Sequence, residues 1–167
     1  MAKALARLNR DGRKSSVVQI AFEHLEQYHA QTLADLKIAG MDEAVEVFLA
    51  PLQPYAAPDG TIYSYYACEE KLMELACKKE TKNSKILVLV DGPPASTGKH
   101  ARYPALPAVL SHFKSNVIDF VLDDFFREDE KEVSDLWRKY CETANLNWKA
   151  ESIKMEKDAF LISIQPK

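Results

Sequence analysis

The chain has 167 residues, of which 47% are hydrophobic and 28% are charged, and its formal net charge is −3. This length and apolar content predict one globular domain with a sizeable core. The scattered Lys and Arg residues do not form the basic stripe that binds a nucleic-acid backbone, and no apolar run approaches the roughly 20 residues that span a bilayer.

The N-terminal segment MAKALARLNRDGRK is basic, but it lacks the continuous apolar run and the cleavage site of a signal peptide. Three cysteines without a CxxC pair argue against both a disulfide framework and a cysteine-rich metal site. The four histidines also lack metal-ligand spacing. We therefore expect a soluble, cytoplasmic protein with no metal ion, no nucleic acid and no membrane as a partner.

Strands and helices alternate along the chain. Short β-branched or aromatic runs predict strands at 16–22, 44–49, 85–91 and 116–124, and two further runs at 148–154 and 159–164 predict a C-terminal hairpin. Apolar residues at helical spacing predict helices within 25–39, 68–76, 106–113 and 133–144, the first of which ends at Gly40. Because parallel neighbours need crossover connections, we expect a single α/β domain over 1–167 with a Rossmann-like, doubly wound, mostly parallel sheet and an antiparallel hairpin.

Acidic side chains follow three of the four expected parallel strands. Glu23 follows the first strand, Asp91 ends the third, and Asp123 and Asp124 end the fourth. Ligands of open α/β sheets bind beyond the carboxyl ends of the strands. A single carboxylate there is as readily a helix cap as a ligand contact, but three such ends beside a rigid Pro-Pro turn favour a site.

The loop DGPPASTGKH after the third strand contains a Gly-Lys pair, which suggests phosphate binding. The Walker A motif GxxxxGK is one residue shorter than the spacing from Gly92 to Gly98, and two prolines remove backbone donors from the loop. A phosphoribosyltransferase loop would need a second acid directly after Asp91. The spacing argues against a phosphate cradle, and a phosphate-handling α/β transferase that uses Asp91 and Lys99 is kept as an alternative.

Two other runs have mainly structural interpretations. Tyr63, Tyr65 and Tyr66 in TIYSYY predict a cluster that packs the start of a helix against the sheet, or else rings that stack on a ligand. The run REDEKE at 127–132 predicts the acidic first turn of an amphipathic helix.

Four segments match one known family in their order and spacing. They are AFEHLEQYHAQTLADLKIAG, VEVFLAPL, ILVLVDGPPASTGKHARYPALP and IDFVLDDFFREDEKEVSDLW. From about residue 15 onward, the chain resembles the later two-thirds of a class I S-adenosylmethionine (SAM)-dependent methyltransferase, of a bacterial group with the signature DGPP…ARYPALP. The resemblance implies methyl transfer from SAM to a small-molecule acceptor.

The resemblance also implies roles for particular residues. Glu23 matches the acid that binds the cofactor ribose, and Pro51 and Leu52 match the loop near the adenine. Asp91 matches the position from which a catalytic residue positions the acceptor or takes its proton. The residues that would line the acceptor side are Pro93, Pro94, Arg102, Tyr103, Asp123, Asp124 and Arg127.

One part of the family pattern has no counterpart. The first strand and the glycine-rich turn after it are missing, and residues 1–14 resemble only a remnant of the helix that follows that turn. Because this strand is normally central, its loss leaves two strands with unpaired backbone groups. We therefore expect an altered sheet, in which 16–22 pairs directly with 85–91, or a homo-oligomer such as a homodimer. We also expect weak or absent SAM binding.

Three hypotheses follow for the function. The chain is an N-terminally truncated methyltransferase of this group, or a catalytically inactive relic of the fold that acts as an oligomerisation or interaction module. The third hypothesis is the phosphate-handling transferase.

Overall fold

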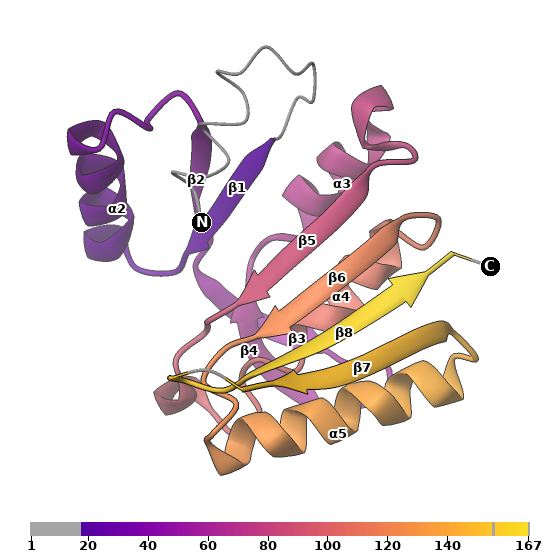
Figure 1. The fold of residues 1–167 in the computed structure, drawn as a ribbon. Helices are drawn as coiled ribbons and strands as arrows, with labels where there is room; N and C mark the ends of the chain where they lie inside the picture. Colours follow the sequence, from indigo (N-terminus) through magenta and orange to yellow (C-terminus); the bar gives the residue numbers. More distant parts are fainter. Residues whose placement is uncertain (1–17, 155, 167) are drawn as a thin grey trace. The chain divides into compact units, whose positions relative to one another are not determined.

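The structure is a computed structural model that describes residues 18–154 and 156–166 (Figure 1). The expected helix remnant at 1–14 lies outside the described residues. The chain divides into two compact units, 1–52 and 53–167, and each is described by itself. In the described part, no helix combines the length and the apolar character needed to cross a membrane.

The first unit contains a parallel βαβ arrangement. Strands β1 (Gln19–Glu23) and β2 (Val45–Leu49) pair in parallel, and helix α2 (Glu26–Ile38) is the crossover between them. The expected end of this helix at Gly40 is confirmed, because Gly40 has a φ of 64° and donates its N–H to the Lys37 carbonyl.

A hairpin that we did not expect follows. Strands β3 (Leu52–Ala56) and β4 (Ile62–Tyr66) form a two-stranded sheet. The tyrosines of TIYSYY, which we expected to pack the start of a helix against the sheet, lie in strand β4. The turn is closed by the Ala57 N–H, which donates to the Thr61 carbonyl at 2.9 Å, and Gly60 takes the φ of 85° that the turn requires.

The second unit is built on a four-stranded sheet in the order β5-β6-β8-β7. Strands β5 (Lys85–Val90) and β6 (Val117–Leu122) are parallel, whereas β8 (Ala159–Gln165) pairs antiparallel with both β6 and β7 (Asn147–Ile153). The expected C-terminal hairpin is confirmed. The helices of this unit are α3 (Glu69–Cys77), α4 (Ala105–His112) and α5 (Glu128–Thr143), with short 3-10 turns η1 (Lys79–Thr81) and η2 (Ala95–Thr97).

The two faces of this sheet differ in what covers them. On one face, Phe120, Phe160 and Ile162 are fully buried, and the Trp137 ring of α5 lies 5.8 Å from the Phe120 ring. On the other face, β5 exposes leucines to solvent. The core of the second unit therefore lies on the helix side of the sheet.

Strands β1 and β5 each have one pairing partner. In the described residues, β1 pairs with β2 and β5 pairs with β6. The expected direct pairing between β1 and β5, which belong to different units, stays a prediction. A homo-oligomer, the other expectation for the missing strand, stays a prediction.

Candidate functional site

The strands β5 and β6 bring two of the expected acidic residues to one edge of the sheet. Val90 lies opposite Leu122 in the parallel ladder, so Asp91 and Asp123 follow at the same end. The Asp123 N–H donates to the Val90 carbonyl at 3.1 Å, which extends the pairing by one residue. Carboxylates of both strands therefore lie at the carboxyl end of the sheet, where ligands of this fold class bind.

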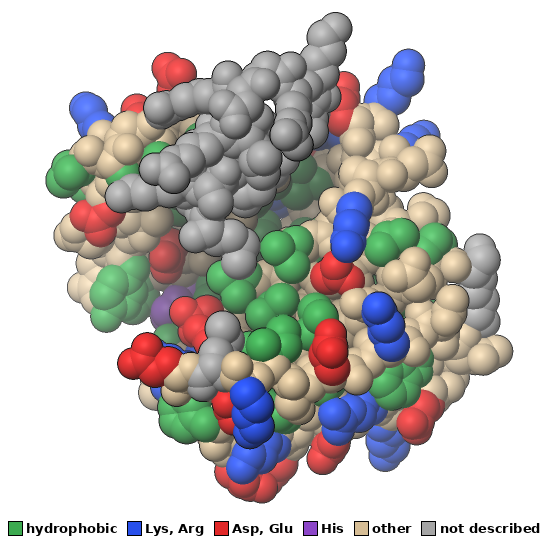
Figure 2. Space-filling model, in the orientation of Figure 1, with side chains coloured by type: hydrophobic (Ala, Val, Ile, Leu, Met, Phe, Trp, Pro, Cys, Tyr) green, Lys and Arg blue, Asp and Glu red, His purple; other side chains and the backbone are tan. Residues whose placement is uncertain are grey.

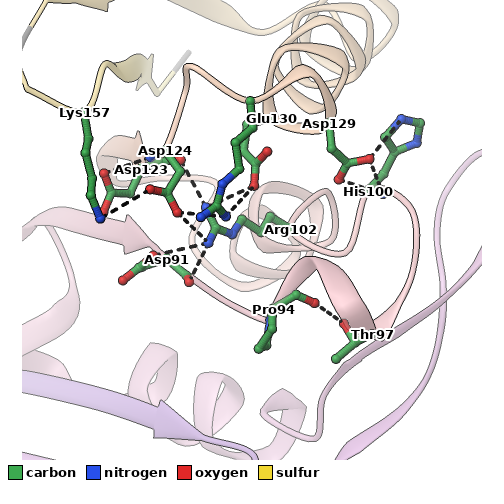
Figure 3. A network of polar contacts seen from close by, with 11 residues as sticks. Asp91, Pro94, Thr97, His100, Arg102, Asp123, Asp124, Asp129, Glu130 and Lys157 are labelled. Atoms are coloured by element: carbon green, nitrogen blue, oxygen red, sulfur yellow. Dashed lines mark hydrogen bonds and ion pairs between the residues drawn. The ribbon is translucent and has the colours of Figure 1, made fainter.

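Arg102 is the centre of a polar cluster at this edge (Figure 3). Its Nη2 donates to the Asp91 carbonyl at 2.8 Å and to Asp91 Oδ1 at 3.2 Å. Its Nη1 donates to the Asp123 carbonyl at 3.1 Å and lies 3.3 Å from Glu130 Oε1. The guanidinium is only 5% exposed, and its fork of donors ties the ends of β5 and β6 to the start of α5.

Asp124 and Glu130 are the buried anions of this cluster. Asp124 Oδ2 lies 3.4 Å from Arg102 Nη2 and 2.9 Å from Arg127 Nη1. Glu130 is 1% exposed, and burial raises the pKa of its carboxyl while Arg102 pulls it down. Asp124 Oδ1, Glu130 Oε2 and Arg102 Nε accept or donate no hydrogen bond within the described protein. Such buried groups are costly to leave unpaired, and in proteins they are commonly satisfied by ordered water.

Asp91 is the exposed acid of the cluster. Its side chain is 65% exposed, in contrast to the 7% of Asp124. Partial burial raises the pKa of the Asp91 carboxyl, and this effect outweighs the attraction of Arg102. A carboxylate with a raised pKa is a better base, and this one is held by a buried cation at an accessible position.

The turn after Asp91 has a fixed shape. The Gly92–Pro93 peptide bond is cis, and Pro93 is buried, whereas Pro94 is exposed and its carbonyl accepts the Thr97 hydroxyl at 2.7 Å. The Tyr66 hydroxyl lies so close to Gly92 that a Cβ at this position would collide with it. The Tyr66 side chain of strand β4 therefore contacts the turn, and a residue larger than glycine at position 92 would have to displace its hydroxyl.

A hollow of about 420 Å³ lies between the hairpin and the loop 97–101. Its polar lining includes Thr61, Ser64, Thr97, Lys99 and His100. This hollow could hold part of a small molecule near the end of β5.

Helix α5 holds the loop 97–101. The His100 N–H lies 3.1 Å from both carboxylate oxygens of Asp129, and His100 Nε2 lies 2.6 Å from Glu132 Oε2. Lys99 Nζ lies 2.8 Å from the same Glu132 oxygen. The Lys99 ammonium is thus already neutralised by a carboxylate.

Tyr103 lies inside the second unit. It is 3% exposed, its carbonyl accepts the Trp137 indole N–H at 2.9 Å, and its ring lies 5.2 Å from the ring of Tyr63. Burial raises the pKa of its hydroxyl. Tyr103 and Arg102 are therefore buried beneath the site, where they support its exposed residues.

The residues expected to bind the cofactor lie in the first unit. Glu23 ends β1, and one of its carboxylate oxygens accepts the Thr32 hydroxyl at 3.1 Å. Pro51 and Leu52 follow β2 as expected, with Pro51 exposed and Leu52 half-buried. A carboxylate at the end of β1 suits the hydroxyls of a ribose, which SAM carries.

The rest of a SAM site is not present in the described residues. A glycine-rich turn would let the backbone approach the cofactor, but the described glycines stand singly, at positions 40, 60, 92 and 98. The described residues therefore provide one polar contact to SAM, from Glu23 to the ribose, but they do not form a complete SAM site.

The structure brings together Asp91, Arg102, Asp123, Asp124 and Arg127, all of which were expected from the sequence. It adds Glu130, Asp129 and Glu132 of α5, which sequence reasoning assigned to an acidic helix turn, and Tyr66 of the unexpected hairpin. The string APDGT, with its Pro-Asp-Gly turn signal, could have revealed the hairpin. No such signal marks which acid of REDEKE is buried.

Comparison with known proteins gives matches among solved structures alone. No protein-family model matches the chain, and no curated protein matches it. The O-methyltransferase from Bacillus cereus in complex with SAH is 12% identical, with a TM-score of 0.54 over 90% of this chain and 64% of that one. The O-methyltransferase TomG from Streptomyces achromogenes, which is involved in tomaymycin synthesis and was solved with SAM, gives the same TM-score and identity over 90% and 62%.

A third match is a human protein. The N-terminal domain of human METTL16 in complex with SAH is 8% identical, with a TM-score of 0.54 over 98% of this chain and 57% of that one. The chain spans between half and two thirds of the length of the first structures that it matches. At these identities the likeness shows the fold alone: a mixed α/β fold of the kind found in SAM-dependent methyltransferases.

Proposed function

We propose that this chain provides the acceptor-binding part of a SAM-dependent methyltransferase that acts on a small molecule. The observation that carries the proposal is the Asp91 carboxylate, which is exposed at the end of β5 and held there by the buried Arg102. Methyl transfer to oxygen or nitrogen requires a positioned acceptor and a group that takes its proton. Asp91 has the position, the exposure and the raised pKa for this role.

The charges at the site favour an acceptor that donates hydrogen bonds. Asp91 presents an exposed carboxylate, whereas Arg102 is buried and already bonded to carboxylates and carbonyls, and the exposed Lys157 is paired with Asp124 at 3.8 Å. An anionic acceptor would meet this negative edge unfavourably. We therefore infer a neutral or cationic acceptor that presents a hydroxyl or amine to Asp91.

The phosphate-handling alternative is disfavoured by the same charges. Lys99 is the cation that it would use, and this ammonium is paired with Glu132 at 2.8 Å. A phosphate would have to displace that carboxylate and lie close to Asp129 and Glu132. The inactive-relic alternative, an oligomerisation or interaction module without catalysis, does not require the site to bind an acceptor.

Acceptor binding can be tested by amide NMR of the whole chain with a panel of catechols, phenols and small amines. We expect compounds of this class to shift the amide signals of Asp91, Gly92 and Thr97–Ala101. Asp91→Asn should weaken these shifts, whereas the matched Asp135→Asn, on the exposed side of α5, should leave them unchanged. Shifts confined to other parts of the chain would contradict the proposal, as would the absence of binding by every compound.

The donor side is tested separately by calorimetric titration with SAM. Because the described residues provide one of the expected contacts and no glycine-rich turn, we expect weak or absent binding. A micromolar dissociation constant would contradict this expectation and would show that the chain has a complete donor site.

A further inference from the structure

One sheet face of the second unit exposes large apolar side chains in the part of the chain that the structure describes, and the proposed function does not use it. The ladder registers place Leu89, Val121, Leu161 and Glu151 in one row across this face. The next row is Leu87, Asp119, Ser163 and Lys149. Figure 2 shows hydrophobic side chains gathered at the centre of this face, over β5, β6 and β8, with charged side chains around them.

Exposed leucines stand at one side of this face. Leu87 and Leu89 of β5 are 52% and 53% exposed, although they lie within a strand between buried or half-buried neighbours. An apolar pair at this exposure forms a ridge along the outer strand. Such a ridge on a sheet face is typical of an interaction surface.

A hollow stands at the opposite side of the same face. It has a volume of about 120 Å³ and is lined by Lys149, Ala150 and Glu151 of β7 and by Leu161 and Ser163 of β8. The small Ser163 lies between longer neighbours, which accounts for the depression. The ridge is on β5 and the hollow is on β7 and β8, so the sheet order separates them by the strand β6.

We propose that this face is a dimer interface with a second copy of the chain. A two-fold axis that runs parallel to the strands, midway between two stacked sheets, places β5 of each protomer over β7 of the other. The registers keep Leu87 and Leu89 level with Lys149 and Glu151, so the ridge of each protomer enters the hollow of the other. Such a contact is self-complementary, as a two-fold interface must be.

The charges of the face also suit a second copy. Two cations, Lys85 and Lys149, and two anions, Asp119 and Glu151, lie on it, and Lys85 Nζ contacts Asp119 Oδ2 at 2.8 Å. A balanced face does not repel its own copy, whereas an anionic membrane or a nucleic acid would find no net attraction. The inference does not depend on the proposed function.

The mass in solution provides the first test, by sedimentation equilibrium of the whole chain. We expect twice the chain mass of 18.9 kDa, and a shift to 18.9 kDa in the double variant Leu87→Lys/Leu89→Lys. The matched control is Met73→Lys, because Met73 is 55% exposed on α3, away from this face. A monomeric wild type would overturn the proposal, because no second copy of the chain would then cover the face. A dimer that survives the double variant would also overturn it.

Cross-linking tests the geometry. In a Cys77→Ser background, which removes the exposed thiol, we would make Leu89→Cys and Glu151→Cys as separate variants. A short bis-maleimide should join the mixture of the two variants into a covalent dimer and should join neither variant to itself, because the axis places β5 over β7. Leu89→Cys that cross-links to itself would contradict this packing, as would a mixture that stays uncross-linked.

Discussion

The two faces of the β5-β6-β8-β7 sheet come from the same strands but have opposite surroundings. The residues that point to the helices are fully buried, as Phe120 and Ile162 are, whereas Leu89 on the other face is 53% exposed. The strict alternation of β6, with every second residue buried, shows that one face alone holds the core of this unit. The covered face holds the core of the unit, and the other face is the one that we propose as a dimer interface.

The largest expected effect is on the covered face. Phe120→Ala removes a fully buried ring that packs against Trp137, so we expect it to lower the free energy of unfolding by about 3–5 kcal/mol. Urea denaturation followed by circular dichroism measures this loss. A loss below about 1 kcal/mol would show that the helices do not pack tightly on this face.

The next effect is expected at the carboxyl edge of the sheet. Arg102→Met leaves Asp124 and Glu130 buried without their shared cation, which typically costs about 3–5 kcal/mol. Burial raises the pKa of Glu130 and the variant removes the Arg102 charge that opposes this rise, so the stability of the variant should fall as pH rises through the raised pKa. Urea titrations at pH 5 and pH 8 measure the effect. A pH-independent loss would argue that the guanidinium acts by packing alone.

A much smaller effect is expected from the other face of the sheet. Leu89→Thr introduces a β-branched strand former and shortens an exposed apolar side chain, so the unfolding free energy of the monomer should change by no more than about 0.5 kcal/mol. The measurement is urea denaturation at a protein concentration where the chain is monomeric. A loss as large as that of Phe120→Ala would mean that Leu89 is buried within the chain itself.

The smallest effect is expected from the salt bridge on this face. Hydrogen bonds from Lys85 and Ser163 hold the pKa of Asp119 below its ordinary value of 3.8. The stabilisation from Asp119 is therefore fully present above pH 3.8 and is lost as pH falls through the lower folded pKa. Acid titration of Asp119→Asn against the wild type should show a difference that is constant near neutral pH and shrinks in acid. If the stability difference between Asp119→Asn and the wild type stays the same in acid, the ionised Asp119 carboxylate is not the source of that difference.

Most of the regular elements could be predicted from the sequence, because their patterns are local. The alternation in β6 and the apolar spacing of α5 are visible in any short window, and so is the hairpin of β7 and β8. The hairpin of β3 and β4 was missed because its aromatic residues were interpreted as a cluster that packs the start of a helix against the sheet, although its turn has a clear signal. Which strand pairs with the other edge of β1 could not be predicted, since strand partners depend on contacts distant in sequence.

The site could be predicted only in part. The resemblance pointed to Asp91, Asp123 and Asp124, which the structure brings to one edge, but it could not show that Arg102 is buried beneath them. Glu130 and Glu132 look alike in the run REDEKE, and only the packing of α5 makes one of them 1% exposed and the other an anchor for His100. Burial of a particular acid is a property of the fold rather than of a short pattern.

The role of Asp91 is tested most directly by the affinity of an acceptor for the wild type and for Asp91→Asn, measured by NMR titration at neutral pH with Asp135→Asn as the control. A hydrogen bond to a charged group contributes about 1.5–3 kcal/mol, so we predict that Asp91→Asn weakens binding by roughly 10- to 100-fold. Equal affinities for the wild type and Asp91→Asn, with the acceptor still bound at the end of β5, would contradict the account.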